Sequence, residues 1–147
     1  MSRIIGVLLV LLIAGCTTMQ EKKAMDMTDA QLSDAVPQMT GQCHCGNIKY
    51  KARGPIVRCS YCDCGGCQKA TGTLKAPFVT VERQGFVITV GEPASFRAES
   101  GAKCDGHGVW NFCPKCGTQV FWKGHEGNEL DIFAGTLDDI TVFKPKE

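Results

Sequence analysis

The arrangement of ten cysteines constrains this 147-residue chain more than any other feature of its sequence. A chain so rich in cysteine uses the sulfurs as metal ligands, as disulfides, or as both. Cys43 and Cys45 form a C-x-C pair, and Cys113 and Cys116 form a C-x-x-C pair followed by glycine. Such a C-x-x-C turn aims two sulfurs at one point, and residues two apart on a strand share a face. The two pairs therefore predict one closed, tetrahedral zinc site of the structural kind.

A second cluster, made of Cys62, Cys64 and Cys67, supplies three sulfurs from one strand–turn–helix segment. Three protein ligands leave a fourth position for water or substrate, which is the pattern of a reactive zinc. Cys59 is a candidate for that position, but on a regular strand it faces away from Cys62 and Cys64. We therefore expect Cys62, Cys64 and Cys67 to hold a second zinc with an open site and to carry any catalysis.

Disulfides are the rival interpretation, because an exported chain meets an oxidising compartment. With Cys16 set aside nine cysteines remain, so complete pairing is impossible. A bridge within a C-x-C pair would also be strained. Zinc is therefore the favoured interpretation of both clusters, and disulfides stay open as the alternative. Cys59 and Cys104, which neither cluster uses, could form a disulfide with each other.

The beginning of the chain indicates export. Arg3 precedes an almost unbroken apolar run from Ile4 to Ile13. A run of about 10 residues is too short to span a membrane but is typical of a signal peptide. It ends in the sequence LIAGC, whose last residue is Cys16, and this resembles the lipobox of bacterial lipoproteins. We expect a signal peptide at 1–15 and a lipid on Cys16; a plain secretory signal is the alternative.

A lipid on Cys16 would hold the protein at the cell envelope by acyl chains rather than by a helix. Because Thr17 rather than Asp follows the cysteine, resemblance to lipoprotein sorting rules favours the periplasmic face of the outer membrane. Residues 16–40 comprise this cysteine and a predicted flexible tether. We expect a tether because the stretch contains no Phe, Tyr or Trp. Such a segment buries too little apolar surface to offset its ordering entropy.

The predicted folded unit is 41–147, and its pattern is that of an all-β domain of several short strands. Polar and apolar residues alternate near 48–50 and 79–81, and Phe86 and Ile88 share one face of a strand with Val87 on the other. β-Type runs cover 111–112, 120–122 and 130–133. Only Gly66 to Thr71 reads as a helix, one turn long. The formal net charge of +1 gives no basic field for nucleic acid. Metal would stabilise so thin a core substantially.

Six motifs run in order through residues 41–147. They are GQCHCG at 41–46, CDCGGCQKATG at 62–72, APF at 76–78, GEP at 91–93, FCPKCGT at 112–118 and AGTLDD at 134–139. This ordered set resembles the glutathione-dependent formaldehyde-activating enzyme family, which also includes the centromere protein V type.

The resemblance implies a small β-tent fold of the Mss4-like type, stapled by zinc. It implies a structural zinc on Cys43, Cys45, Cys113 and Cys116, and a second zinc on Cys62, Cys64 and Cys67. It also implies a carbon–sulfur lyase, as in the joining of glutathione and formaldehyde into S-hydroxymethylglutathione. The expected partner is then glutathione or another small thiol, with no nucleic acid, and the sequence says nothing of oligomeric state.

Two functions follow as expectations. The first is a zinc-thiolate carbon–sulfur lyase, and the alternative is a non-catalytic zinc-stabilised module that binds a partner or buffers metal or thiols at the envelope. Among other residues, Trp110 and Trp122 read as core aromatics that could line a pocket. Asp138 and Asp139 read first as a tight turn. His44, His107 and His125 read first as solvated, and Lys69 and Lys103 as surface lysines.

Overall fold

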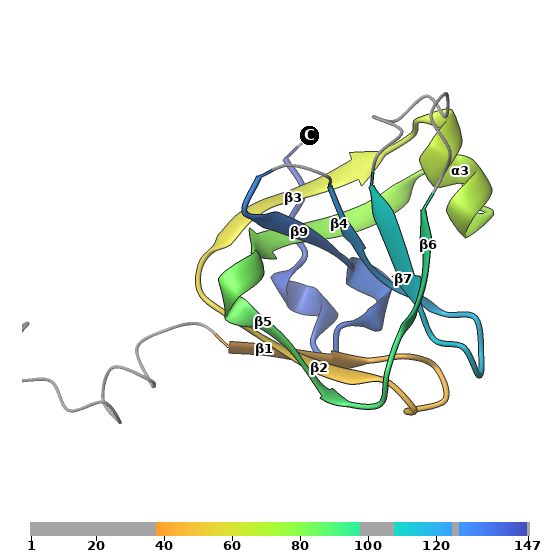
Figure 1. Cartoon of the computed structure of the whole chain (residues 1–147). Coiled ribbons are helices and arrows are strands. Elements are labelled where there is room, and N and C mark those ends of the chain that lie inside the picture. The colour runs from red at the N-terminus through yellow and green to blue at the C-terminus, as the bar shows by residue number, and fades with distance from the viewer. Residues whose placement is uncertain (1–37, 98–107, 125–126, 147) are drawn as a thin grey trace, which may run out of the picture. The chain divides into compact units, whose positions relative to one another are not determined.

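The computed structural model describes residues 38–97, 108–124 and 127–146. Within them, nine strands form two antiparallel sheets, accompanied by one short α-helix (Figure 1). The smaller sheet has the order β1 (Gln38–Gln42), β2 (Lys49–Arg53), β5 (Phe86–Val90). The larger sheet has the order β3 (Ile56–Cys62), β4 (Ala76–Glu82), β9 (Glu129–Phe133), β8 (Gln119–Lys123), β7 (Val109–Phe112), β6 (Ala94–Arg97). The predicted all-β class is confirmed.

Short helical segments lie between the strands and after the last one. The helix α3 (Gly65–Thr71) lies between β3 and β4 and confirms the predicted helical turn. Three 3₁₀ turns follow later in the chain: η1 (Arg83–Gly85), η2 (Ala134–Thr136) and η3 (Ile140–Val142). Among the described residues no helix has the length and apolar content needed to cross a membrane.

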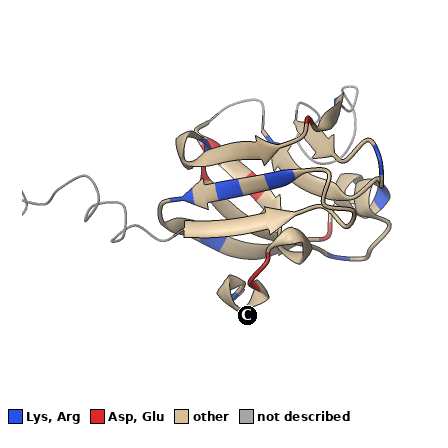
Figure 2. Cartoon of the chain, turned by 90° about the horizontal axis from the view of Figure 1, so that it is seen from below, with Lys and Arg blue, Asp and Glu red and all other residues tan. Residues whose placement is uncertain are grey.

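The two sheets enclose the first hydrophobic core. Along β2, Tyr50 and Ala52 are buried, whereas Lys49, Lys51 and Arg53 are exposed, as strand alternation requires. Figure 2 shows the basic residues as blue bands along this strand. The buried side chains of the small sheet pack against the inward residues of β4, β8 and β9, chiefly Val79, Val81, Val120, Leu130 and Ile132.

The opposite face of the large sheet carries a second cluster. On β4, Ala76 and Phe78 alternate with the residues that enter the first core, so this strand is buried on both faces. Phe78 packs on Phe133, with ring centroids 4.7 Å apart, and Trp110 completes the cluster. Trp110 is therefore a core aromatic as predicted. Cys67 of α3 is buried in this cluster and is the most deeply buried member of the second cysteine group.

The first strand begins earlier than the predicted start of the folded unit. β1 starts at Gln38, within the stretch predicted as tether, and Met39 is buried opposite Ala52. The sequence hides this strand because it lacks aromatic and β-branched residues apart from Thr40. The edge strand β6 was likewise not predicted, since Ser95, Phe96 and Arg97 are all exposed and show no alternation.

Several predictions fall outside the described residues. They are the signal peptide, the lipidation site Cys16, most of the tether, and the residues Lys103, Cys104, His107 and His125.

Candidate metal centres

The first cysteine pair lies in a tight turn that follows β1. The backbone N–H of Cys43 donates to the carbonyl of Ile48 at 3.0 Å, and that of Gly46 donates to the carbonyl of Cys43 at 3.0 Å. Gly46 has a φ of 72°, a left-handed conformation that glycine adopts without strain. The pair was predicted on a strand, and this was wrong. The turn brings both sulfurs to one side and also directs the Ile48 amide at Cys43 Sγ, at 3.2 Å.

The second pair lies in a turn of the same kind after β7. Cys113 N–H donates to the carbonyl of Thr118 at 2.9 Å, and Gly117 N–H donates to the carbonyl of Cys113 at 2.8 Å. The Thr118 hydroxyl joins the two turns: it accepts the His44 amide at 3.2 Å and lies 3.2 Å from Cys116 Sγ. The Thr118 side chain thus helps to hold side by side two turns that are far apart in the chain.

The sulfurs of these two turns have the spacing of a tetrahedral metal site. Cys43 Sγ lies 3.6 Å from Cys45 Sγ, which lies 3.8 Å from Cys113 Sγ. All four sulfurs, that of Cys116 included, lie within 4.8 Å of one another. A zinc–sulfur bond of about 2.3 Å places tetrahedral sulfurs about 3.8 Å apart. Cys43, Cys45, Cys113 and Cys116 therefore fit a zinc ion with little movement.

The protonation of this group is uneven without a metal. The Thr118 hydroxyl and amide lower the pKa of Cys116 to about 5. The Asn47 amide lowers the pKa of Cys45, but desolvation and the neighbouring sulfurs outweigh it and raise that pKa to about 11. When one sulfur is ionised it raises the pKa of its neighbours, because two negative charges so close together are unfavourable. A divalent cation would remove this conflict.

The second group assembles where β3 ends and α3 begins. Cys62 is the last residue of β3, and Cys64 is the N-cap of α3, where its sulfur accepts the Cys67 amide at 3.4 Å. The three sulfurs lie within 4.8 Å of one another. Strand alternation was expected to place Cys64 beside Cys62, but Cys64 lies outside the strand, and the helix start brings it in. The sulfurs of Cys62 and Cys67 are 2.9 Å apart, so binding of a zinc ion would move them roughly 1 Å further apart.

Cys64 differs from the other described cysteines. It is disulfide-bonded, whereas the seven others are free thiols. A disulfide sulfur is not a thiolate, and thiolates are the sulfur ligands of zinc. The second group is therefore a three-thiolate site only when Cys64 is reduced, and the disulfide alternative applies here and not to the first group.

Cys59 belongs to neither group. Its sulfur faces the first core and donates to the carbonyl of Val142 at 3.7 Å. Cys59 and Cys62 thus point to opposite faces of β3, as alternation predicted. Because Cys59 is a free thiol, the suggested disulfide between Cys59 and Cys104 is wrong.

Cys67 lies in an apolar environment. It is 5% exposed and packs with Phe78, Trp110 and Phe133, while Trp122 lies at the edge of the cluster. Burial first, and then the sulfur of Cys62, raise the pKa of Cys67 to about 12. The thiol therefore keeps its proton at neutral pH unless a cation displaces it.

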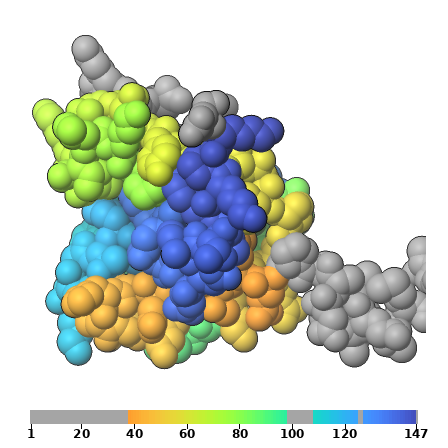
Figure 3. Space-filling model, turned by 180° about the vertical axis from the view of Figure 1, so that it is seen from behind, coloured from red at the N-terminus to blue at the C-terminus, as the bar shows by residue number. Residues whose placement is uncertain are grey.

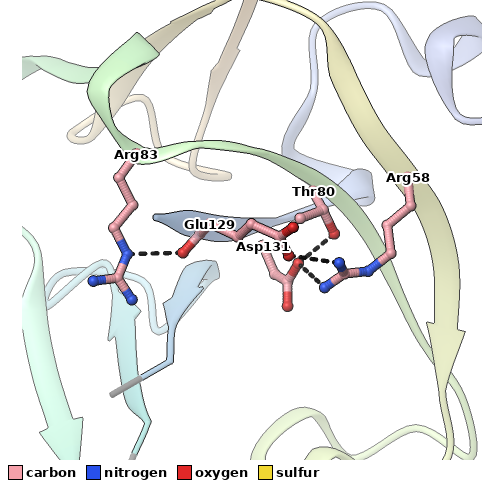
Figure 4. A network of polar contacts seen from close by, with 5 residues as sticks. All are labelled: Arg58, Thr80, Arg83, Glu129 and Asp131. Atoms are coloured by element: carbon pink, nitrogen blue, oxygen red, sulfur yellow. Dashed lines mark hydrogen bonds and ion pairs between the residues drawn. The ribbon is translucent and has the colours of Figure 1, made fainter. Parts of the chain in front are cut away.

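A polar network adjoins this apolar cluster on the same face of the sheet. Asp131 of β9 lies opposite Trp122 and Thr80 on the neighbouring strands, and it accepts a hydrogen bond from the Thr80 hydroxyl (Figure 4). Arg58 pairs with Glu129 at 2.6 Å and with Asp131 at 3.5 Å. Burial raises the pKa of Asp131, although the Thr80 hydroxyl and Arg58 lower it. In the sequence, Asp131 was marked only by its position two residues before Phe133, which places both side chains on the same face of a strand.

A hollow of about 410 Å³ lies between α3, the segment of residues 117–119 and η2. Figure 3 shows the face on which these three segments meet. The described residues that line the hollow are Ala70, Thr71, Thr73, Pro77, Gly117, Thr118, Gln119, Phe133, Gly135 and Thr136. Gln119 had no signal in the sequence. Phe133 belongs both to this lining and to the cluster around Cys67, so the hollow and the second sulfur group share a wall.

The remaining candidates have structural roles or lie on the surface. Asp139 caps the backbone amide of Thr141 at 2.9 Å, which confirms the tight-turn interpretation. Asp138 accepts the Thr40 hydroxyl at 2.6 Å. His44 and Lys69 are exposed.

Comparison with known proteins identifies a family and a structure of similar fold. A family model described as glutathione-dependent formaldehyde-activating enzyme matches residues 38–147. The crystal structure of a Rhodobacter sphaeroides protein is similar over 68% of this chain and 88% of that one, with a TM-score of 0.54 and 19% identity. At that identity the likeness concerns the fold. None of the curated proteins compared matches the chain.

Proposed function

Since this chain belongs to the glutathione-dependent formaldehyde-activating enzyme family, we propose that it is a zinc-binding carbon–sulfur lyase. Its substrate would be a hydroxymethyl-type adduct of a small thiol such as glutathione, formed or cleaved at the group Cys62, Cys64 and Cys67. The observation that carries the proposal is the contrast between the two sulfur groups. One offers four sulfurs, a complete tetrahedral set, and the other offers three beside a buried aromatic cluster.

The two groups suit different tasks. Cys43, Cys45, Cys113 and Cys116 would fill all positions of a zinc ion, which is the pattern of a structural site. Cys62, Cys64 and Cys67 would leave one position for a ligand. A zinc bound there would lower the pKa of a substrate thiol, as a zinc ion lowers that of bound water. Cys67 is the deepest member of this group, so its position is the best fixed by packing.

The chemistry requires no redox partner. The sulfur of the thiol forms a bond to the carbonyl carbon of formaldehyde, the C=O π electrons move to oxygen, and that oxygen takes the proton that the thiol gives up. The reverse step breaks the C–S bond and returns the proton. The chain's own contribution is to orient the thiol and to exclude water, and Trp110, Phe133 and Phe78 supply an apolar wall for this purpose.

Exchange NMR with ¹³C-formaldehyde and glutathione tests the proposal. The reduced, zinc-loaded protein should accelerate exchange between free formaldehyde and the thiol adduct. Cys62→Ser should lower this acceleration by at least about 100-fold, since even supporting residues of zinc sites contribute 10–100-fold. Cys59→Ser is the matched control, because that free thiol lies on the opposite face of the same strand. Full acceleration in Cys62→Ser would overturn the proposed site, and a panel of other small thiols would identify the substrate.

One observation favours a second candidate function. The disulfide on Cys64 would leave one zinc on the four-sulfur group and none on the other. The protein would then be a non-catalytic zinc-stabilised module that binds a partner or buffers thiols at the envelope. Zinc counting before and after mild reduction separates the two: a second zinc gained on reduction supports the lyase, and a constant count of one supports the module.

We also propose that the chain is lipid-anchored through Cys16, on the periplasmic face of the outer membrane. The support is the apolar run and the LIAGC sequence that ends in this cysteine. Expression in a Gram-negative host with a radiolabelled fatty acid should label the wild type and not Cys16→Ala. Equal labelling of both proteins would contradict the anchor.

A further inference from the structure

We propose that the hollow between α3, the segment of residues 117–119 and η2 binds the uncharged, amide-bearing part of the substrate, with Gln119 as the residue that accepts a hydrogen bond from it. The identity of the ligand as a peptide-like thiol rests on the proposed function. The site itself rests on the hollow and on the unsatisfied side chain in its wall.

Gln119 lies at the junction of the two sulfur groups. It directly follows Thr118, whose hydroxyl contacts Cys116, and its Nε2 donates to the carbonyl of Ala70 on α3 at 3.4 Å. Ala70 is three residues after Cys67 on the same short helix. A ligand that contacts Gln119 therefore lies beside α3, the helix that carries Cys67.

The side-chain carbonyl of Gln119 lacks a donor. Its Oε1 is buried and has no hydrogen-bond partner among the described residues. Because the Ala70 carbonyl can only accept, it faces the Nε2 group of Gln119 and leaves Oε1 directed elsewhere. Buried polar atoms are nearly always paired, and an unpaired one calls for an explanation. A ligand donor that reaches Oε1 is such an explanation, and the long bond to Ala70 leaves the amide free to turn toward it.

The lining determines what kind of ligand fits. None of the described residues that line the hollow is charged. Ala70, Pro77 and Phe133 offer apolar surface, and a Cβ at Gly117 or Gly135 would meet no atom within 4 Å, so their backbone borders open space. The volume of about 410 Å³ is within the range of small-molecule sites. The occupant is thus neutral at this point of contact and carries an N–H, as the peptide bonds of glutathione do.

Titration with S-methylglutathione, followed by NMR, tests the site without the chemistry. This probe keeps both amide N–H groups but has no thiol to ionise. It should bind the wild type, and Gln119→Met should weaken binding at least 10-fold, because methionine keeps the size but not the acceptor. Gln68→Met is the matched control: Gln68 lies on α3, as Ala70 does, and its amide donates to the Leu74 carbonyl at 3.2 Å. Its affinity should stay within 2-fold of the wild type.

A second variant covers the case in which Gln119→Met perturbs folding. Gly135→Val places methyl groups in the open part of the hollow and leaves Gln119 untouched, and it should weaken binding to a similar degree. Unchanged affinity in both variants, or no binding to the wild type, would overturn the inference. These outcomes are independent of the proposed reaction, whose own test is the loss of exchange in Cys62→Ser.

Discussion

The two sulfur groups should contribute unequally to stability, because they close chain loops of very different length. Cys45 and Cys113 are 68 positions apart, whereas Cys62 and Cys67 are 5 apart. A cross-link acts largely by restricting the unfolded chain, and its effect grows with the logarithm of the loop length. Applied to these separations, the chain-entropy relation gives about 4 kcal/mol for the first link and about 2 kcal/mol for the second.

Cys113→Ser in reduced, zinc-saturated protein should therefore lower the free energy of unfolding by about 4 kcal/mol. Burial adds to this effect, since Cys113 is 0% exposed and serine places a hydroxyl where a sulfur was. For a domain near 100 residues, each kcal/mol shifts Tm by roughly 4–8 °C. The expected decrease is at least about 15 °C, against about half of that for Cys62→Ser.

Thermal unfolding followed by far-UV circular dichroism measures both shifts under one condition. Cys59→Ser is the control, since the Cys59 sulfur takes part in neither group and closes no loop. Equal decreases in Tm for Cys113→Ser and Cys62→Ser would refute the reasoning. A wild-type Tm that does not change when zinc is removed by a chelator would refute it as well.

Three further predictions concern packing and protonation. Gly41→Ala should destabilise the domain by roughly 1–3 kcal/mol in urea unfolding, because its Cβ would collide with the Tyr50 hydroxyl; unchanged stability would contradict this contact. Zinc affinity should rise with pH between pH 6 and 8, by up to about tenfold per pH unit for each thiol proton that zinc displaces. The reason is that the raised pKa of Cys45, about 11, keeps its thiol protonated in this range. Zinc titrations that give the same affinity at pH 6 and pH 8 would contradict this prediction. In metal-free protein at pH 6.5, Cys116 should be alkylated first, because its pKa of about 5 makes it a thiolate, and Thr118→Val should slow this reaction; peptide mapping that finds another cysteine first would contradict it.

Local sequence spacing predicted the two sulfur groups because each depends on short-range geometry. The turn that holds Cys113 and Cys116 is encoded by the C-x-x-C-G pattern, whose glycine takes the left-handed conformation at φ 74°. The same holds for the pair of Cys43 and Cys45, although the turn there replaced the expected strand. The packing of the two turns against each other is not encoded by local sequence. It depends on the hydroxyl of Thr118, whose contacts only the folded chain reveals.

Other features depended on tertiary packing that a sequence pattern does not record. Met39 joins the core only because β1 pairs with β2, and no periodicity in the segment before it indicates a strand. Gln119 becomes notable only when α3 is folded against it and leaves its carbonyl unpaired. The placement of Cys64 at a helix N-cap, rather than on a strand, follows from where β3 ends.

Native mass spectrometry of the reduced, purified chain, combined with a disulfide count, tests the central claim most directly. If the seven sulfurs of the two groups are zinc ligands, each chain should carry two zinc ions and no disulfide. A reduced chain that stays metal-free while its β-structure is intact would contradict the account.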